Sequence, residues 1–342
     1  MRYPTTLNIG DTIGICAPSS GAPGDILSAR LDNAICNIKA LGYNVIETAS
    51  VRNDTKCVSA DSRTRAIEFM ELYDNPDITA ILPPWGGEFL MDMLPYLDFN
   101  KLNTLPPKWV CGYSDMSTLT FTLTINSDIA SIHGSNLMNM GFTRIHDADL
   151  RVFDVMSSNE TTQHSWDSWG GFTNWEDLTV DAYKLDKPSL WKSLHGETHV
   201  HFNGMMIGGC MDTLCKLLGT RFAPVNEFLG KYKRYGFIWT LESCEMAAPD
   251  IYRTFWQMRE NGWFRYCTGI IIGRPDGYKD KRDFTLVDAL MQGLGSLDFP
   301  VLYDADIGHV PPQIQIVNGA IGKVEFIKGK AKIIQELINN DS

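Results

Sequence analysis

Short apolar runs alternate with segments of helical periodicity over the first half of this 342-residue chain. The run at residues 12–17 is followed by a loop rich in Pro, Ser and Gly, and residues 26–41 then carry apolar side chains at helical spacing up to Gly42. Short apolar runs are typical of buried strands, and a period near 3.6 is typical of helices. With a further strand at residues 43–46, the pattern predicts a β-α-β unit.

The same alternation continues towards residue 111. It predicts a helix over residues 62–73 and strands over residues 78–82 and 109–111. This order favours an α/β fold whose N-terminal domain, residues 1–150, contains a doubly wound parallel sheet. Ligands of such sheets bind at the carboxyl ends of the strands.

The alternation ends between about residues 143 and 192, where no sustained period of either kind is present. This stretch contains Trp166, Trp169, Trp175 and Trp191. We expect a Trp-rich connecting loop over residues 151–195 and a C-terminal domain over residues 196–342. The expected strands of that domain are 198–202, 236–241, 269–272, 301–304 and 322–327, and the expected helices are 211–218 and 250–261.

Composition restricts the class of protein. Hydrophobic residues make up 44% and charged residues 21%, which is ordinary for a globular protein. No stretch approaches the length of a membrane span, and residues 1–6 do not resemble a signal peptide, so we expect a cytoplasmic protein. The net charge of -11 disfavours binding to nucleic acid or an anionic membrane. A small-molecule ligand is the expectation that follows.

The eight cysteines occur singly and form no C-x-x-C pair. This pattern is typical of buried reduced thiols rather than disulfides or a metal site. His199 and His201 alternate on an expected strand and so share a face, as two zinc ligands would. No third ligand follows at a recognisable spacing, so we interpret them as exposed strand residues and expect neither a metal nor a cofactor.

Three segments place a serine, a glutamate and a histidine where apolar runs end. They are GYSD at residues 112–115, LESCE at 241–245 and DIGHVPP at 306–312. A serine hydroxyl attacks an amide only if an imidazole accepts its proton and a carboxylate orients that imidazole. Ser114, His309 and Glu242 can fill these roles. The α/β-hydrolase elbow reads G-x-S-x-G, and Met116 in place of its second glycine argues against that fold.

Each of these residues has an alternative interpretation. Ser114 taken alone is better explained as the N-cap of a helix. Glu245 can replace Glu242 as the acid if the segment is helical, and His133 is a rival base because it also ends a short apolar run. The glycine-rich residues 204–209 lack the G-x-x-x-x-G-K-[ST] motif, which disfavours nucleotide hydrolysis.

The three segments together resemble those of the LD-carboxypeptidase family, whose branches include muropeptide LD-carboxypeptidases and microcin C self-immunity peptidases. Further similar stretches follow in the same order along nearly the whole chain: GDTIGICAPSS at residues 10–20, WGG at 85–87, GMMIGGC at 204–210 and GIIIGRP at 269–275. The resemblance implies a compact, β-barrel-like C-terminal domain and a homodimer. It also implies that Ser114 is the nucleophile, His309 the base and Glu242, rather than Glu245, the orienting acid.

An oxyanion hole needs two N–H donors aimed at the developing charge. The resemblance favours a backbone N–H of Gly86 or Gly87 together with that of Asp115. Which of the two glycines donates is left open.

The tryptophans bear on the substrate. Large aromatic rings in a polar loop either pin the loop to the domain or offer a platform for a flat ligand such as a nucleobase. The immunity branch acts on aminoacyl nucleotide analogues, so Trp166, Trp169, Trp175 and Trp191 are candidate substrate-binding residues. Met246 and Ala247 provide no lysine after the acid segment, which argues against specificity for acidic aminoacyl groups.

The sequence thus predicts a serine carboxypeptidase-like amidohydrolase of antibiotic self-immunity or detoxification. Its substrate would be a small peptide or aminoacyl nucleotide, cleaved at an amide or phosphoramidate bond. The alternative enzyme is a muropeptide LD-carboxypeptidase of cell-wall recycling. A catalytically silent binding protein is disfavoured because the serine, glutamate and histidine are all present.

Overall fold

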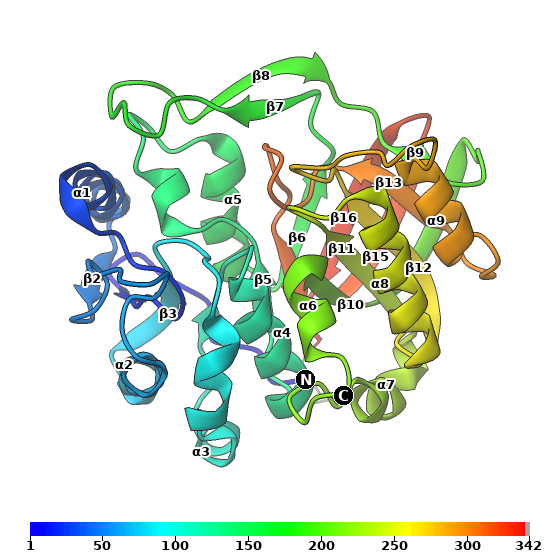
Figure 1. Cartoon of the computed structure of the whole chain (residues 1–342). Helices are drawn as coiled ribbons and strands as arrows, with labels where there is room; N and C mark the ends of the chain where they lie inside the picture. Colours follow the sequence, from blue (N-terminus) through cyan, green and yellow to red (C-terminus); the bar gives the residue numbers. More distant parts are fainter. Residues whose placement is uncertain (339–342) are drawn as a thin grey trace.

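A parallel sheet of four strands, in the order β2-β1-β3-β4, forms the centre of the N-terminal half. The computed structural model describes residues 1–338 (Figure 1). The strands are β1 (Thr12–Ile15), β2 (Asn44–Glu47), β3 (Ile78–Leu82) and β4 (Trp109–Val110). The helices that follow them are α1 (Gly24–Ala40), α2 (Ser62–Asp74), η1 (Leu90–Tyr96), α3 (Phe99–Thr104), α4 (Met116–Ser127) and η2 (Leu137–Met140).

Helices cover both faces of this sheet, because successive strand residues point in opposite directions. Ala80 and Leu82 of β3 pack in the cluster that contains Leu31 of α1, whereas Ile81 packs in the cluster that contains Phe69 of α2. The predicted doubly wound parallel sheet is therefore confirmed.

The C-terminal half is built on a mixed sheet of eight strands in the order β6-β16-β15-β10-β11-β12-β13-β9. Its centre is a parallel group of β10 (His199–Cys210), β11 (Phe237–Glu242), β12 (Cys267–Gly273) and β13 (Val301–Ala305). The outer strands are β6 (Glu160–His164), β9 (Lys192–Ser193), β15 (Ile321–Ile327) and β16 (Lys330–Glu336). The helices are α6 (Met211–Leu217), α7 (Val225–Tyr232), η3 (Lys233–Tyr235), α8 (Ala248–Glu260) and α9 (Leu286–Leu294). The second domain that the resemblance implies to be β-barrel-like is present as this mixed sheet of eight strands.

Helix α4 lies buried between the two halves. Eleven of its twelve residues are buried, and a helix that is buried all round must be covered on every side. Phe121 packs against Trp239 of β11 and Trp263, at ring-centroid distances of 6.2 and 5.4 Å. Strand β5 (Ser131–His133) also pairs antiparallel with β14 (Ile316–Asn318), which comes from the end of the chain. One continuous core therefore joins the N-terminal sheet to the C-terminal sheet.

The segment expected as a connecting loop is more regular than its sequence pattern indicated. It contains the end of α5 (Asp147–Met156), the edge strand β6, the hairpin of β7 (Ser168–Phe172) and β8 (Tyr183–Pro188), and β9. The hairpin crosses the top of the molecule in Figure 1. Strands β6, β7 and β8 bury almost no side chains on either face, so their sequences carry no apolar alternation.

Burial of the cysteines differs from the expectation. All eight thiols are free, but only Cys16, Cys111 and Cys210 are buried, while Cys36 and Cys57 are exposed. Within residues 1–338, no helix has the length and apolar character needed to cross a membrane.

The buried carboxylate of Asp306 ties the Trp-rich segment to the C-terminal sheet. It pairs with Arg274 at 2.5 Å and accepts hydrogen bonds from the Trp166 backbone N–H, the Ser189 hydroxyl and the Trp191 ring N–H at 2.8–2.9 Å. Asp306 and Arg274 are 0% and 5% exposed. A buried charge is stable only when it is paired and hydrogen-bonded, and these four donors meet that need.

We expect Asp306→Asn to lower the free energy of unfolding by about 3–5 kcal/mol, because the Arg274 charge would stay buried without a partner. Urea unfolding measures this change. The control is Asp154→Asn, since Asp154 pairs with Arg151 at an exposed site and should change stability by less than about 1 kcal/mol. Equal effects of the two substitutions would contradict the anchoring role of Asp306.

Candidate active site

The carboxyl ends of the parallel strands in the C-terminal sheet bring together residues that are far apart in sequence. Cys210 ends β10 and is the register partner of Glu242, which ends β11. The chain that leaves β13 continues through Asp306 to His309. Because parallel strands end at one edge of a sheet, these side chains converge there.

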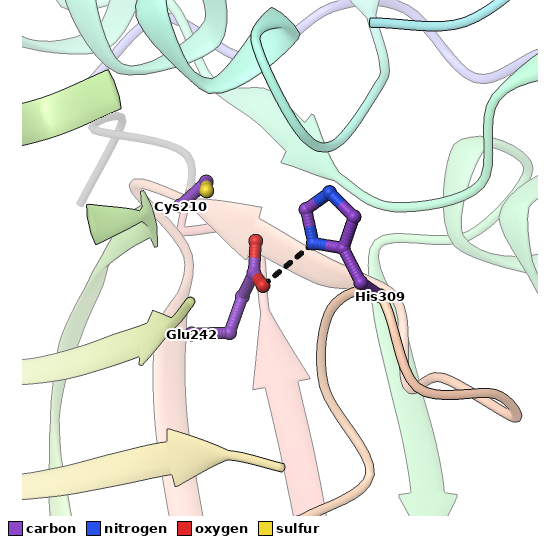
Figure 2. Close-up of side chains that lie close together, drawn as sticks. All are labelled: Cys210, Glu242 and His309. Carbon is purple, nitrogen blue, oxygen red and sulfur yellow. Dashed lines mark hydrogen bonds and ion pairs between the residues drawn. The ribbon is translucent and has the colours of Figure 1, made fainter. Parts of the chain in front are cut away.

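Glu242 and His309 form a hydrogen-bonded pair at this edge. The Nδ1 atom of His309 lies 2.8 Å from Oε2 of Glu242, and Glu242 is completely buried (Figure 2). Gly308 has a φ of +91°, and a Cβ atom there would lie 2.5 Å from Glu242 Oε2. Only glycine allows the loop to pass this close to the carboxylate. The Tyr113 and His309 rings pack edge-on with their centroids 4.9 Å apart, and this contact limits the rotation of the His309 ring.

The two partners shift each other's pKa in opposite directions. Burial by itself lowers the pKa of His309, but the charge of Glu242, the Cys244 side chain and the Glu242 hydrogen bond outweigh it and raise that pKa well above its ordinary value. Burial by itself raises the pKa of Glu242, yet the charge and hydrogen bond of His309 leave that pKa below its ordinary value. The site therefore stabilises a carboxylate beside an imidazolium.

Ser114 lies in the tight turn between β4 and α4, with a φ of +64°. Left-handed backbone at a residue other than glycine is strained, and such strain is common at functional sites. Asp115 is the N-cap residue of α4, and its carboxylate accepts hydrogen bonds from the Ser19 hydroxyl at 2.6 Å and the Leu90 N–H at 2.8 Å. Its side chain fixes the turn, and its backbone adjoins Ser114.

The Gly86-Gly87 loop approaches this turn closely. A Cβ atom on Gly86 would lie 2.6 Å from the Cβ of Ser114 and 2.9 Å from the backbone nitrogen of Asp115. A Cβ on Gly87 would collide with the serines at residues 19 and 20. The structure thus brings Gly86, Gly87 and Asp115 together beside Ser114.

Ser114 and His309 line two adjoining cavities. The larger, of about 1000 Å³, also has Asp212, Lys216, Glu245 and Arg253 in its wall. The smaller, of about 480 Å³, is lined by Leu27, Trp85 and Tyr113. One cavity is therefore rich in charge and the other in aromatic and apolar surface, with Ser114 between them.

The four tryptophans of the connecting segment lie elsewhere, and none of them lines either cavity in the described residues. Trp191 is 1% exposed and bonded to Asp306. Trp169 lies under the cations of Lys187 and Arg274, Trp166 packs on His146, and Trp175 packs on Phe142 and Phe172. These contacts match the alternative that the rings pin the segment to the protein.

Trp85 is the aromatic residue that sequence reasoning missed. It lines the smaller cavity, and its ring N–H donates to the Gly21 carbonyl at 2.8 Å. The available signal was its position directly before Gly86 and Gly87, which we had assigned to the oxyanion hole.

The rival residues have other places. Glu245 is exposed on the wall of the larger cavity. His133 is buried behind Glu242, with its Nε2 atom 3.8 Å from Oε1 of Glu242 and its Nδ1 atom 3.3 Å from the Ser117 hydroxyl. It lines neither cavity, so it faces the acid rather than a substrate. His199 and His201 are exposed side by side on β10, with ring centroids 6.5 Å apart.

We expect Glu242→Gln to lower the pKa of His309, because burial then acts on the imidazolium without a compensating charge. Titration of the imidazole by NMR measures it. Glu245→Gln is the control, because Glu245 is exposed and follows Glu242 by three residues in the sequence. This substitution should leave the pKa of His309 high. A His309 pKa that stays high in Glu242→Gln would contradict the pairing.

The raised pKa of His309 also makes the stability of the folded protein depend on pH. The folded-state pKa of His309 lies above its ordinary value of about 6.5, so the Glu242–His309 pair contributes its full stabilisation below about pH 6.5. This contribution is lost as the pH rises through the raised pKa of His309.

Comparison with known proteins supports one family. The family models of the LD-carboxypeptidase N-terminal and C-terminal domains match residues 13–134 and 203–324. The microcin C7 self-immunity protein of Escherichia coli is 24% identical over 98% of this chain and 96% of its own length. The murein tetrapeptide carboxypeptidase of Pseudomonas aeruginosa is 25% identical over 88% of this chain and 89% of its own length.

Solved structures share the fold. The crystal structure of an MccF-like protein from Bacillus anthracis superposes with a TM-score of 0.85 at 21% identity, covering 98% of this chain and 99% of the other. The microcin C7 self-immunity protein in complex with aspartyl sulfamoyl adenosine has a TM-score of 0.82 at 23% identity, covering 98% and 99%. Since the two family models match most of the chain, this protein belongs to the LD-carboxypeptidase family of serine hydrolases.

Proposed function

We propose that this protein is a serine carboxypeptidase-like amidohydrolase in which Ser114 is the nucleophile, His309 the base and Glu242 the acid that orients His309. The observation that carries the proposal is the Nδ1–Oε2 bond of 2.8 Å, beside a serine that lines the same cavities as His309. The Nε2 atom of His309 has no hydrogen-bond partner among the described residues, so it is available for the serine proton.

The reaction follows from these positions. His309 Nε2 accepts the hydroxyl proton while Ser114 Oγ attacks the carbonyl carbon, and the Glu242 carboxylate stabilises the imidazolium. Backbone N–H groups of the Gly86-Gly87 loop and of Asp115 stabilise the oxyanion. His309 then gives the proton to the leaving nitrogen, and water releases the acyl group by the same route. Since only neutral His309 is a base, the rate should rise with pH through its raised pKa.

For the substrate we propose an aminoacyl nucleotide that spans Ser114. The smaller cavity offers the Trp85 and Tyr113 rings to a nucleobase, and the larger cavity offers charged side chains to the aminoacyl group. The Escherichia coli relative has been solved in complex with aspartyl sulfamoyl adenosine and with glutamyl sulfamoyl guanosine, which supports this substrate class.

A muropeptide is the second candidate. Asp212, Lys216 and Arg253 present charges of both signs in the larger cavity, which suits the zwitterionic end of a peptide. The Pseudomonas aeruginosa relative is named a murein tetrapeptide carboxypeptidase. Parallel assays on a tetrapeptide muropeptide and an aminoacyl sulfamoyl adenosine distinguish the two.

Ser114→Ala should lower kcat on the order of a millionfold while leaving the fold and substrate binding intact, because the hydroxyl is needed for the chemistry and adds little packing. Steady-state kinetics and calorimetric binding measure the two effects. Ser20→Ala is a matched control from the wall of the smaller cavity. Near-normal turnover by Ser114→Ala would rule out the mechanism.

Trp85→Ala should reduce kcat/KM for the adenylate substrate by a factor that corresponds to roughly 1–3 kcal/mol of binding free energy, the size of one base–aromatic stack. The same change should affect kcat/KM for the peptide substrate far less. Trp169→Ala is the control, because its ring packs against Lys187 and Arg274 and lines neither cavity. Equal losses on both substrates in Trp85→Ala would argue against a nucleobase in the smaller cavity.

A further inference from the structure

The thiol of Cys210 lies next to the Glu242–His309 pair. The sulfur, a carboxylate oxygen and a ring nitrogen of these three residues all lie within 4.8 Å of one another. In Figure 2 the Glu242 carboxylate stands between Cys210 on one side and His309 on the other. Cys210 is 1% exposed and is among the residues that line the larger cavity, so the three residues adjoin a space that solvent can enter.

This group has unused binding capacity. The Oε1 atom of Glu242 is buried and has no hydrogen-bond partner among the described residues. Buried polar atoms without a partner are rare, and an unfilled ligand position is one physical explanation for them. Oε1 also lies 3.8 Å from Nε2 of His133.

We infer that Cys210, Glu242 and His309 form an inhibitory binding site for a thiophilic divalent cation, with Zn²⁺ as the best match. Zinc binds sulfur at about 2.3 Å and nitrogen or oxygen at about 2.0–2.2 Å in tetrahedral geometry, so its ligand atoms lie about 3.4–3.6 Å apart. The three atoms lie within 4.8 Å of one another, so side-chain rotations that bring the most distant pair closer by roughly 1 Å let them share one ion. The binding step stands on this geometry, and its effect on activity rests on the proposed function.

Charge balance favours a dication here. A thiolate and a carboxylate together carry two negative charges, which Zn²⁺ cancels, and a neutral imidazole completes the set. A buried site is stable when its charges cancel in this way. Without an ion, burial and the nearby Glu242 carboxylate keep the pKa of the Cys210 thiol well above its ordinary value.

The protons balance as follows. Cys210 releases its S–H proton to water when the Zn–S bond forms. When Nδ1 of neutral His309 binds the ion, the ring proton moves to Nε2, and an imidazolium releases one further proton. A ring protonated on Nε2 cannot accept the Ser114 proton, so bound zinc stops the reaction at its first step.

Because protons are released, zinc should bind more tightly as the pH rises. The titratable groups that surround the sulfur come from several elements. They are Glu242 of β11, Asp212 of α6 at 3.5 Å, Cys244 after β11, His309 after β13 and, behind Glu242, His133 of β5.

The test uses the full chain and two readouts. Co²⁺ titration of Ser114→Ala monitors sulfur-to-cobalt charge-transfer absorption, which does not depend on turnover. Zn²⁺ inhibition of substrate hydrolysis, with EDTA reversal, is measured on the unsubstituted protein, Cys210→Ala and Cys215→Ala, each relative to its own metal-free rate. Cys215 is the matched control because it is a half-buried thiol on the wall of the same cavity.

We expect the cobalt band in Ser114→Ala and its loss when Cys210→Ala is added. Zinc inhibition should weaken by at least roughly tenfold to 100-fold in Cys210→Ala and stay unchanged in Cys215→Ala. Thermal unfolding confirms that each variant is folded. Absence of the band in Ser114→Ala, or equal zinc sensitivity of Cys210→Ala and the unsubstituted protein, would overturn the inference. A cobalt band in a protein that cleaves neither substrate would leave the site standing and remove the proposed function.

Discussion

The position of His309 depends on the buried carboxylate of Asp306. His309 belongs to no helix or strand, so its place is set by the chain that leaves β13. Asp306, three residues earlier, is held by Arg274, Ser189 and the Trp-rich segment. Because Arg274, Ser189 and Trp191 are themselves buried, the loop cannot shift without leaving an uncompensated charge in an apolar interior. The Asp306–Arg274 ion pair, which takes no part in the proposed chemistry, thereby fixes the position of the His309 side chain.

The site also needs both halves of the molecule at once. Ser114 follows strand β4 of the N-terminal sheet, whereas Glu242 and His309 lie at the carboxyl ends of strands in the C-terminal sheet. The buried helix α4 starts two residues after Ser114 and packs on the C-terminal sheet, so the serine turn is anchored to both cores. Shared burial therefore sets the position of Ser114 relative to the hydrogen-bonded Glu242–His309 pair.

Sequence periodicity could predict only the elements whose pattern is decided by burial. The apolar run of β3 (Ile78–Leu82) matches the expected strand, because both of its faces are covered. The edge strand β6 reads ETTQH and carried no such signal. Within the site, the strand-end motifs indicate Ser114, Glu242 and His309 as candidates, but the register that places Cys210 opposite Glu242 is a property of strand pairing and cannot be read from spacing. Trp191 was misjudged for a related reason, since an aromatic ring in a polar segment gives no indication of the buried carboxylate that it contacts.

One physical feature links catalysis and metal sensitivity in this site. A carboxylate that orients an imidazole must be buried, because burial keeps the Glu242–His309 attraction strong. Burial also leaves the second oxygen, Oε1, without a hydrogen-bond partner among the described residues. When the neighbouring strand ends in a thiol, that unsatisfied oxygen becomes part of a donor set that suits zinc. A side chain without a metal-binding atom at position 210 would leave the orienting pair intact and remove the third ligand, so the sensitivity is a consequence of Cys210 rather than of the mechanism.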